Sequence, residues 1–320
     1  MPADHRSSAA AQRPLRVAVT GASGLIGGCL CKLLTEHGHE TLRLVRRTPA
    51  RPGEAEWRPE SGLRAAPAVE GLDALVHLAG ESIASGRWSA ARKRAIRDSR
   101  VEGTSALVRS FADLRAPPRV FVGTSATGYY GDRGDARLDE RAGPGGGFLA
   151  EVCVAWEAAA RGAERVCERV VVTRLGVVLS REGGALERML LPFRLGLGGP
   201  LGSGEQFMPW IAIDDVARAL LRTVTAAALA GPVNLVAPEE ATNREFTRAL
   251  GRALRRPVVL RVPALALRLA LGREMADELL LTSARVVPSR LVESGFEFEH
   301  PRLQGALRTL LQQPPERVNG

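Results

Sequence analysis

Three glycines at the junction of two apolar segments form the strongest chemical signal in this sequence. Residues 16–19 are typical of a buried strand, and leucine and isoleucine recur at helical intervals from Leu25 to Leu34. Glycine at the junction permits a tight turn and lets the amides at a helix start approach a phosphate. The spacing therefore predicts a diphosphate-binding turn, whose expected cofactor contacts are Gly21, Ser23, Gly24, Leu25, Ile26 and Gly27. An ordinary glycine-rich turn without a ligand is the alternative.

Two arginines, Arg46 and Arg47, end the second predicted strand, residues 41–45. In a dinucleotide-binding fold the side chain at this point faces the adenosine ribose. A carboxylate there selects the 2′-hydroxyl, whereas the planar guanidinium of arginine suits a 2′-phosphate. No Asp or Glu occurs between Thr41 and Arg51. The sequence therefore predicts NADP(H), with at least one of the two arginines on the 2′-phosphate, and solvated surface arginines as the alternative.

The segments that must position these residues alternate between strand-like and helix-like patterns. Strands are expected at residues 15–19, 41–45, 74–78, 119–123, 170–175 and 233–236, and helices at 25–37, 101–111, 150–160 and 216–224. This alternation predicts an α/β fold with a Rossmann-type, doubly wound parallel sheet. Asp214 and Asp215 precede the last of these helices and are expected to cap it.

The domain organisation follows from where the alternation stops. Residues 14–184 are expected to form the NADP-binding domain, with residues 205–240 returning to it. Residues 185–204 and 241–320, rich in glycine and proline and then helical in pattern, are expected to form a smaller, helix-rich C-terminal lobe that closes over the cofactor. Residues 1–13 lack an apolar core and read as a disordered tail rather than a signal peptide.

Composition excludes several classes of protein. The 320 residues are 45% hydrophobic and 25% charged, which is typical of a soluble globular protein. The longest apolar stretch, near residues 258–271, is interrupted by arginine and proline, so no membrane span or membrane partner is expected. The four cysteines and five histidines show no metal-ligand spacing, and His77 ends an apolar strand as a core residue would. A reduced, cytoplasmic protein is expected.

The net charge of +9 raises the possibility of nucleic-acid binding. Aromatic residues make up only 4% of the chain, and the arginines are spread along it. The one basic run, residues 87–100, is typical of a solvated helix face. We therefore expect no nucleic-acid partner, and a monomer or homodimer.

Several motifs taken together resemble the extended short-chain dehydrogenase/reductases of the epimerase/dehydratase group. These are the turn at Gly21, residues 77–80 (HLAG), 124–131 (TSATGYYG) and 210–215 (WIAIDD). Residues 80–82, 87–100, 148–157, 196–204 and 241–246 are similar to the atypical, YfcH-like branch labelled "epimerase family". The resemblance covers residues 15–310. It implies further cofactor contacts at Leu78, Ala79, Gly80, Glu81, Arg100, Ser125 and Val178.

The sequence departs from this family at the catalytic residues. Active members use a serine, a tyrosine that transfers the proton, and a lysine four residues after the tyrosine. Ser125 matches the serine, but Leu149 and Cys153 fall at the tyrosine and lysine positions. No lysine follows Lys93, and the chain has only two tyrosines. The sequence therefore excludes the standard mechanism.

Three other side chains are candidates for catalysis. Ser125 could donate a hydrogen bond, and Tyr129, or Tyr130 beside it, could act as an acid if Arg100 lies close enough to lower a phenol pKa. Cys153 could be a thiol acid or a redox sensor, with a buried packing residue as the alternative.

The predicted function is an NADP(H)-dependent oxidoreductase or isomerase that acts on a small molecule by a non-standard active site. The alternative is a non-catalytic NADP(H) sensor that recruits a protein partner. The cofactor-binding residues favour both hypotheses equally, and only the missing proton-transfer pair separates them.

Overall fold

An eight-stranded sheet organises the computed structural model, which describes residues 13–64 and 66–312. The strand order is β11-β8-β6-β5-β1-β2-β3-β4, and every pairing except β3–β4 is parallel. The strands of this sheet are β1 (Arg16–Thr20), β2 (Glu40–Val45), β3 (Glu54–Arg58), β4 (Gly62–Leu63), β5 (Ala74–His77), β6 (Val120–Ala126), β8 (Arg169–Leu175) and β11 (Gly231–Leu235). The order reverses between β1 and β5, which is where such folds bind dinucleotides.

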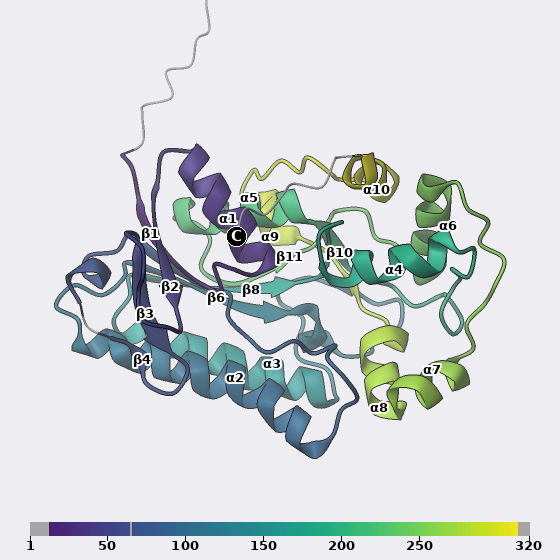
Figure 1. Ribbon diagram of the computed structural model, residues 1–320, viewed down its shortest axis with the longest axis horizontal. Helices are drawn as coiled ribbons and strands as arrows, with labels where there is room; N and C mark the ends of the chain where they lie inside the picture. The colour runs from purple at the N-terminus through teal and green to yellow at the C-terminus, as the bar shows by residue number, and fades with distance from the viewer. Residues whose placement is uncertain (1–12, 65, 313–320) are drawn as a thin grey trace, which may run out of the picture.

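Helices cover both faces of the sheet (Figure 1). Helices α1 (Leu25–Glu36) and α5 (Ile213–Thr225) pack together on one face, and α2 (Ala90–Arg109) and α3 (Phe148–Arg161) lie side by side on the other. Because both faces are covered, the central strands read as continuous apolar runs, and Val17, Ala18 and Val19 of β1 are all fully buried. This three-layer arrangement confirms the predicted Rossmann-type α/β fold.

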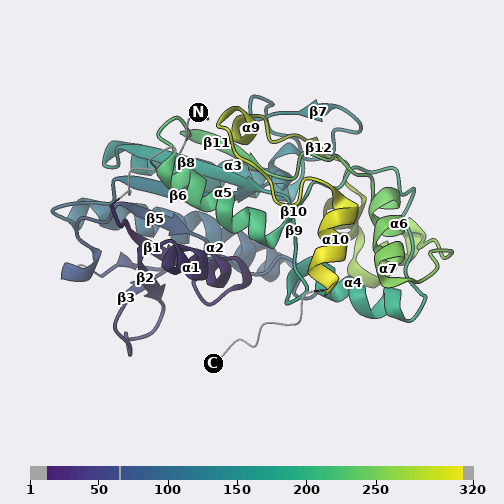
Figure 2. The same cartoon turned by 90° about the horizontal axis from the view of Figure 1, so that it is seen from above.

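A second group of elements lies beyond the carboxyl ends of the large sheet (Figure 2). Two short strand pairs, β9–β10 and β7–β12, connect it to the sheet, and a separate apolar cluster of α4, α6 and α10 forms its core. Its elements are β7 (Arg137–Leu138), β9 (Val177–Leu179), α4 (Gly184–Arg194), β10 (Trp210–Ala212), α6 (Asn243–Leu254), α7 (Ala264–Leu271), α8 (Arg273–Ala276), β12 (Arg285–Val286) and α10 (Leu303–Gln312). Helix α9 (Ser289–Glu293) instead packs beside β11, with Leu291 in the core of the large sheet. The C-terminal part of the chain is thus rich in helix, as predicted.

Most predicted strands and helices are present, with bounds that differ by a few residues. The basic run predicted as a helix begins α2 at Ala90. The strands β3 and β4 were not predicted. Charged residues at positions 54, 56 and 58 alternate with Ala55 and Trp57 along β3, and of these five only Ala55 and Trp57 are buried. The edge strand β4 has only two residues, too few to form a pattern. The predicted tail, residues 1–13, lies outside the described residues except for Arg13.

The prediction that Asp214 and Asp215 cap a helix was wrong. Helix α5 begins at Ile213, so both residues lie inside its first turn, and no side chain caps it. Asp215 is fully buried and accepts the amides of Glu299 and His300 at 2.8 and 2.9 Å. It therefore attaches the segment before α10 to helix α5, a tertiary role that helix-capping rules do not reveal.

Within the described residues, no helix is both long and apolar enough to cross a membrane.

Candidate functional site

The glycine turn lies at the carboxyl end of β1 and leaves no room for side chains. Gly21 has φ 65°, and a Cβ there would lie 3.1 Å from the carbonyl carbon of Leu78. A Cβ on Gly27 would lie 2.2 Å from the oxygen of Gly21, so α1 packs directly against the turn. Helix α1 starts at Leu25, and its first amides point out of the helix without intrahelical acceptors. The turn therefore has the shape and the free N–H groups that a diphosphate requires.

A network of buried polar groups fixes the loop that faces this turn. The hydroxyl of Thr20 accepts hydrogen bonds from the amides of Leu78 and Ala79, at 3.0 and 3.2 Å. The same hydroxyl lies 2.8 Å from Nδ1 of His77. Nε2 of His77 lies 3.1 Å from the hydroxyl of Thr104. Burial lowers the pKa of His77 to about 4, so the ring is neutral and can accept from one hydroxyl while donating to the other. His77 is thus a core residue that positions residues 78–80.

The strand tip carries two arginines in different environments. Arg47 donates two hydrogen bonds to the carboxylate of Glu54, at 2.7 and 2.9 Å, and these bonds hold the pKa of Glu54 down to about 2. Arg46 is exposed and makes no hydrogen bond or ion pair with the described residues. Arg46 could therefore bind a phosphate without breaking an existing bond. Arg47 would have to share its guanidinium between the phosphate and Glu54.

Arg100 lies beside the loop that follows β5. A Cβ on Gly80 would lie 3.5 Å from the guanidinium carbon of Arg100, which also stacks over the ring of Trp156 at 5.1 Å. Burial lowers the pKa of Arg100, and its guanidinium donates a hydrogen bond to the carbonyl of Ile96 at 3.1 Å. Glu81, the next residue of this loop, is exposed and pairs with Arg92 at 3.3 Å. Arg100 is thus a half-buried cation at the carboxyl edge of the sheet.

A buried ion pair lies under the loop that follows β6. Arg174 and Glu157 are 2% and 1% exposed and form two hydrogen bonds, at 2.8 and 2.9 Å. The hydroxyl of Ser125, also buried, donates to Glu157 at 2.9 Å. Burial alone would lower the pKa of Arg174, but its bonds to Glu157 and Tyr130 raise it above the ordinary value. Ser125 is therefore already committed to a carboxylate in this structure.

The two tyrosines lie against Arg174, not against Arg100 as the sequence hypothesis required. The guanidinium carbon of Arg174 lies 3.5 Å from the centre of the Tyr129 ring. Tyr130 is fully buried, accepts a hydrogen bond from Arg174 at 2.9 Å and donates to Asn234 at 2.7 Å. Burial raises the pKa of Tyr130 to about 12, which makes it a poor acid. Tyr129 is only half-buried, and its hydroxyl makes no hydrogen bond with the described residues.

Helix α3 carries Leu149 and Cys153 where the family has tyrosine and lysine. Cys153 is 4% exposed, and burial raises the pKa of its thiol to about 11 although a hydrogen bond with Ser125 opposes the rise. The amides of Phe148 and Leu149 donate to the carboxylate of Glu278 at 2.9 and 2.8 Å. A carboxylate from the π-helical turn Asp277–Leu281 thus occupies the start of α3.

Leu25, Ile26 and Val178 form an apolar wall beside the turn. All three are partly buried and pack against the cluster of α4, α6 and α10. A Cβ on Gly183 would lie 3.5 Å from the side chain of Leu25, which brings the chain after β9 against the start of α1. The residues predicted as cofactor contacts therefore come from β1, α1, β2, the loop after β5, α2, β6 and β9, all near the carboxyl ends of the strands.

Sequence reasoning missed the buried partners Glu157, Arg174, Asn234 and Thr20. Two of them left a signal: Arg174 interrupts the apolar strand 170–175, and Glu157 lies on the apolar face of α3 beside Trp156. A positive side chain in a buried strand and a negative one on the buried face of a helix predict that the two form a buried ion pair. The described residues contain no group of three or more His, Cys, Asp or Glu that could hold a metal ion.

Comparison with known proteins agrees with this geometry. The model of the NAD dependent epimerase/dehydratase family matches residues 17–236, and a domain of unknown function, DUF1731, matches residues 262–310. The chain is 47% identical to the epimerase family protein Mb2239 of Mycobacterium bovis over 91% of this chain and 96% of the relative. It is 40% identical to human epimerase family protein SDR39U1 over 93% of this chain and all of that protein.

Two solved structures superpose on most of the chain. The crystal structure of human SDR39U1 (isoform 2) with NADPH has a TM-score of 0.83 at 38% identity, covering 92% of this chain and 99% of that one. A structure described as a nucleoside-diphosphate sugar epimerase from Corynebacterium glutamicum has a TM-score of 0.75 at 36% identity, covering 93% of this chain and 58% of that one. The chain belongs to the NAD dependent epimerase/dehydratase family, in its SDR39U1-like branch of epimerase family proteins.

Proposed function

We propose that this protein binds NADP(H) and acts as an oxidoreductase or isomerase on a small molecule, without the usual tyrosine–lysine pair. The observation that carries the proposal is the side-chain-free turn at Gly21, which faces residues 78–80 and the helix start of α1. The human relative crystallised with NADPH supports the choice of cofactor. The protein is proposed to work in the cytoplasm, as a monomer or homodimer, and without nucleic acid.

The cofactor would be held along the carboxyl edge of the sheet. Gly21, Ser23, Gly24 and the start of α1 would bind the diphosphate, Arg46 or Arg47 the 2′-phosphate, and Arg100 the cofactor from the far side of Gly80. When bound, NADPH supplies a hydride. The protein must then supply a proton and stabilise the negative charge that develops on the substrate.

Tyr129 is the proposed proton donor. Its phenol is half-buried, makes no hydrogen bond with the described residues, and lies under the guanidinium of Arg174 at 3.5 Å. A cation at that distance would stabilise the negative charge left on the ring after proton transfer. Ser125 would contribute a hydrogen bond only by turning away from Glu157, and the thiol of Cys153 is both buried and hard to ionise.

A non-catalytic NADP(H) sensor that recruits a protein partner is the second candidate. It is favoured because the other candidate groups are poor proton donors to a substrate. The hydroxyls of Ser125 and Tyr130 already donate hydrogen bonds to buried acceptors, and the thiol of Cys153 has a raised pKa. Such an arrangement can bind a cofactor and order the loops around it without transferring a proton.

Two variants test the cofactor site, which both candidate functions require. Arg100→Ala is expected to weaken NADPH binding about tenfold, the cost of a lost charge-assisted hydrogen bond. Cys153→Ser, similar in size, is the matched control and should bind NADPH as the wild type does. Calorimetry measures both affinities. Unchanged affinity in Arg100→Ala would remove that residue from the cofactor site.

Turnover is measured on the same proteins with the small molecules that co-purify, identified by mass spectrometry. An enzyme should consume NADPH in proportion to product, and Tyr129→Phe should bind the cofactor but lose turnover. If no co-purifying molecule is turned over by a wild type that binds NADPH tightly, the sensor is the better description.

A further inference from the structure

Seven large apolar side chains protrude into solvent from one end of the C-terminal lobe. They come from the end of α4, the segment before α7, and α7 itself, whose sequence is ALALRLAL and which has no buried residue. Their exposed fractions run from 46% to 78%: Leu191, Leu195, Leu197, Val259, Leu260, Leu265 and Leu269. A soluble surface has single apolar side chains scattered over it, whereas a contiguous group of this kind indicates a docking site.

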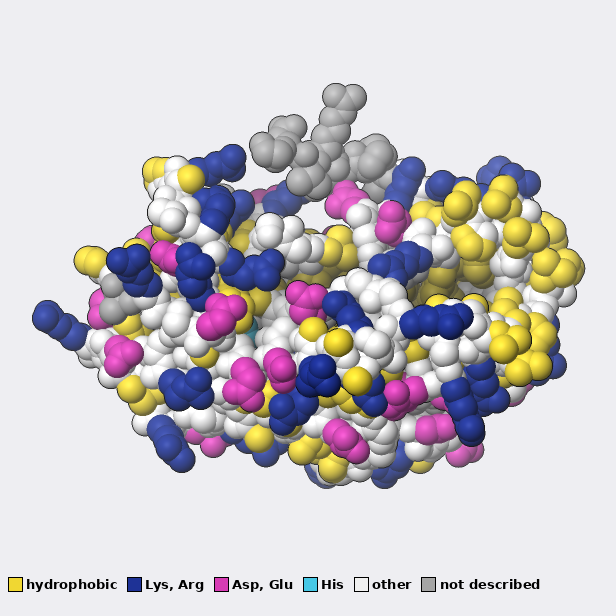
Figure 3. Space-filling model, turned by 60° about the horizontal axis from the view of Figure 1, so that its bottom comes forward, with side chains coloured by type: hydrophobic (Ala, Val, Ile, Leu, Met, Phe, Trp, Pro, Cys, Tyr) yellow, Lys and Arg dark blue, Asp and Glu magenta, His cyan; other side chains and the backbone are white. Residues whose placement is uncertain are grey.

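These side chains form one surface, which we call the C-terminal docking face. Residues 199–202 pair with residues 260–262, through Val262 N to Pro200 O and Gly202 N to Val262 O, both at 2.9 Å. This pairing brings the chain after α4 against the chain before α7. Figure 3 shows the hydrophobic side chains gathered at this end of the molecule, with Lys and Arg side chains around them.

A row of arginines borders the docking face. Arg244, Arg248 and Arg252 lie at intervals of four along α6, and Arg255 and Arg256 follow its end. Residues 244–273 contain eight arginines and one carboxylate. Like charges at this helical spacing repel one another, so the row costs stability unless an anionic partner faces it. The side chains of Arg248, Arg252, Arg255 and Arg256 make no hydrogen bond or ion pair with the described residues.

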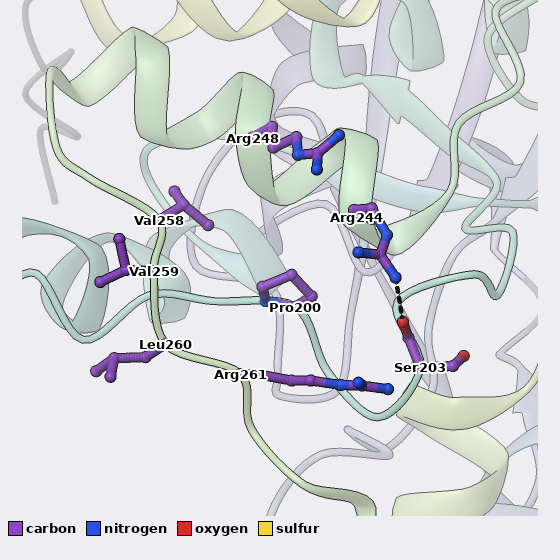
Figure 4. A pocket seen from close by; sticks show the side chains of 8 residues that line it. All are labelled: Pro200, Ser203, Arg244, Arg248, Val258, Val259, Leu260 and Arg261. Carbon is purple, nitrogen blue, oxygen red and sulfur yellow. Dashed lines mark hydrogen bonds between the residues drawn. The ribbon is translucent and has the colours of Figure 1, made fainter.

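A small cavity of about 180 Å³ joins the arginine row to the apolar side chains (Figure 4). Arg244 and Arg248 line it from α6 and Arg261 from the facing segment, beside Val259 and Leu260. Arg244 donates to the carbonyl of Ser203 at 2.8 Å and pairs with Glu205, but its buried Nε has no partner among the described residues. The cavity thus presents guanidinium groups next to apolar carbon, which suits a lipid headgroup phosphate with its acyl chains nearby.

We propose that the C-terminal docking face binds the surface of an anionic lipid membrane. The leucines of α4 and α7 would enter the headgroup region, and the arginines of α6 and its cavity would bind lipid phosphates. Exposed leucines bordered by arginines are the combination that favours insertion into the headgroup region of an anionic membrane. A second copy of this chain fits poorly, because a two-fold contact would bring the same arginine rows together.

The proposal departs from the expectation of no membrane partner, which depended on the absence of an apolar span. Peripheral docking requires no span, only an exposed apolar face and a positive border. The excess of arginine over carboxylate in residues 244–273 lies beside the docking face, where it would attract an anionic surface.

Co-sedimentation with lipid vesicles tests the proposal on the full chain. The wild type should bind vesicles of 70% phosphatidylcholine and 30% phosphatidylglycerol, bind pure phosphatidylcholine vesicles much more weakly, and dissociate as salt is raised. The double variant Leu265→Glu, Leu269→Glu should lose at least about tenfold in partition. Arg248→Ala should lose about fivefold.

Matched controls lie on the large-sheet domain: Val154→Glu, exposed on α3, and Arg165→Ala, exposed after it. Both should bind vesicles as the wild type does, and circular dichroism checks that all variants fold. Equal binding to neutral vesicles, or equal losses in the controls, would overturn the proposal. So would binding of inorganic phosphate in calorimetry without vesicle binding, or a dimer in ultracentrifugation that the leucine variants dissociate.

Discussion

Charged side chains near the candidate site are largely bound to one another, and this determines what each can offer a ligand. Glu157 accepts from Ser125 and Arg174, and Arg47 is held by Glu54. Breaking a buried pair leaves an uncompensated charge, which is far more costly than losing a surface pair. The groups that remain available are those without such partners, above all Arg46, Arg100 and Tyr129.

Cofactor choice is expected to depend more on Arg46 than on Arg47. Arg46→Ala should lower NADPH affinity about tenfold or more, the value of a charge-assisted phosphate contact, and should leave NADH affinity unchanged. Arg47→Ala should lose less, because Glu54 already neutralises that guanidinium. Calorimetry with both nucleotides measures this.

Glu54→Gln provides the control for that comparison. It frees Arg47 from a carboxylate and should raise NADPH affinity if Arg47 reaches the phosphate. Equal affinities for NADPH and NADH in the wild type, or an unchanged preference in the Arg46→Ala, Arg47→Ala double variant, would contradict the assignment of the strand tip.

His77 is expected to make stability depend on pH. Its pKa falls from 6.5 in the unfolded chain to about 4 in the folded protein, so protonation favours unfolding. The stabilisation is complete above pH 6.5 and is lost as the pH falls towards 4, a total of about 3 kcal/mol. Urea unfolding measures this between pH 7 and 4. The difference in free energy of unfolding between the wild type and His77→Gln should shrink by that amount as the pH falls. Parallel curves would show that His77 does not titrate as the burial implies.

At the scale of elements, the sequence predicted the parts whose residues interact locally. Gly21, Gly24 and Gly27 indicate the turn because steric limits act over a few bonds, and the strand at residues 170–175 was visible as an apolar run. The bonds from Glu157 to Ser125 and Arg174 join residues 32 and 17 positions apart, and no periodic pattern reports such distances. Strand β3 was missed for a different reason, because its alternating charges match an exposed loop as well as a half-buried strand.

The glycine turn should separate binding from folding. Gly24→Val should abolish NADPH binding while the protein stays folded, because the added side chain would occupy the diphosphate space and meets only the oxygen of Gly21, at 3.2 Å. Gly27→Val should destabilise the protein by about 1–3 kcal/mol, because its Cβ would lie 2.2 Å from that oxygen.

Gly28→Ala is the matched control for both, since its Cβ meets only the oxygen of Ala22 at 3.9 Å. It should bind normally and gain about 0.5–1 kcal/mol from helix propensity. Calorimetry and urea unfolding of the three variants measure the two effects. Normal NADPH binding by Gly24→Val would mean that the diphosphate lies elsewhere.

At the scale of the whole molecule, the C-terminal lobe is attached to the cofactor-binding domain around the candidate site. Arg87 donates to the carbonyls of Leu269 and Ala270 at the end of α7, and Lys93 pairs with Glu274 at 2.5 Å. Glu278 accepts the first amides of α3. The residues that carry these contacts on the cofactor side are 87 to 93 and the start of α3. They lie at or just before the starts of the two helices that carry Arg100 and Cys153, so the C-terminal lobe is joined to the elements of the candidate site.

Glu278 is expected to contribute most to that attachment. Glu278→Ala removes the acceptor for two amides of α3, a loss comparable to a helix cap, and should lower the free energy of unfolding by about 0.5–2 kcal/mol. Glu274→Ala, which breaks only a half-exposed pair with Lys93, is the matched control and should cost less than about 1 kcal/mol. Urea unfolding measures both. Because Trp156 of α3 stacks against Arg100, loosening the start of α3 should weaken NADPH binding in Glu278→Ala and not in Glu274→Ala. Equal effects of the two substitutions on stability and binding would mean that the lobe is held by its surface charges rather than by the start of α3.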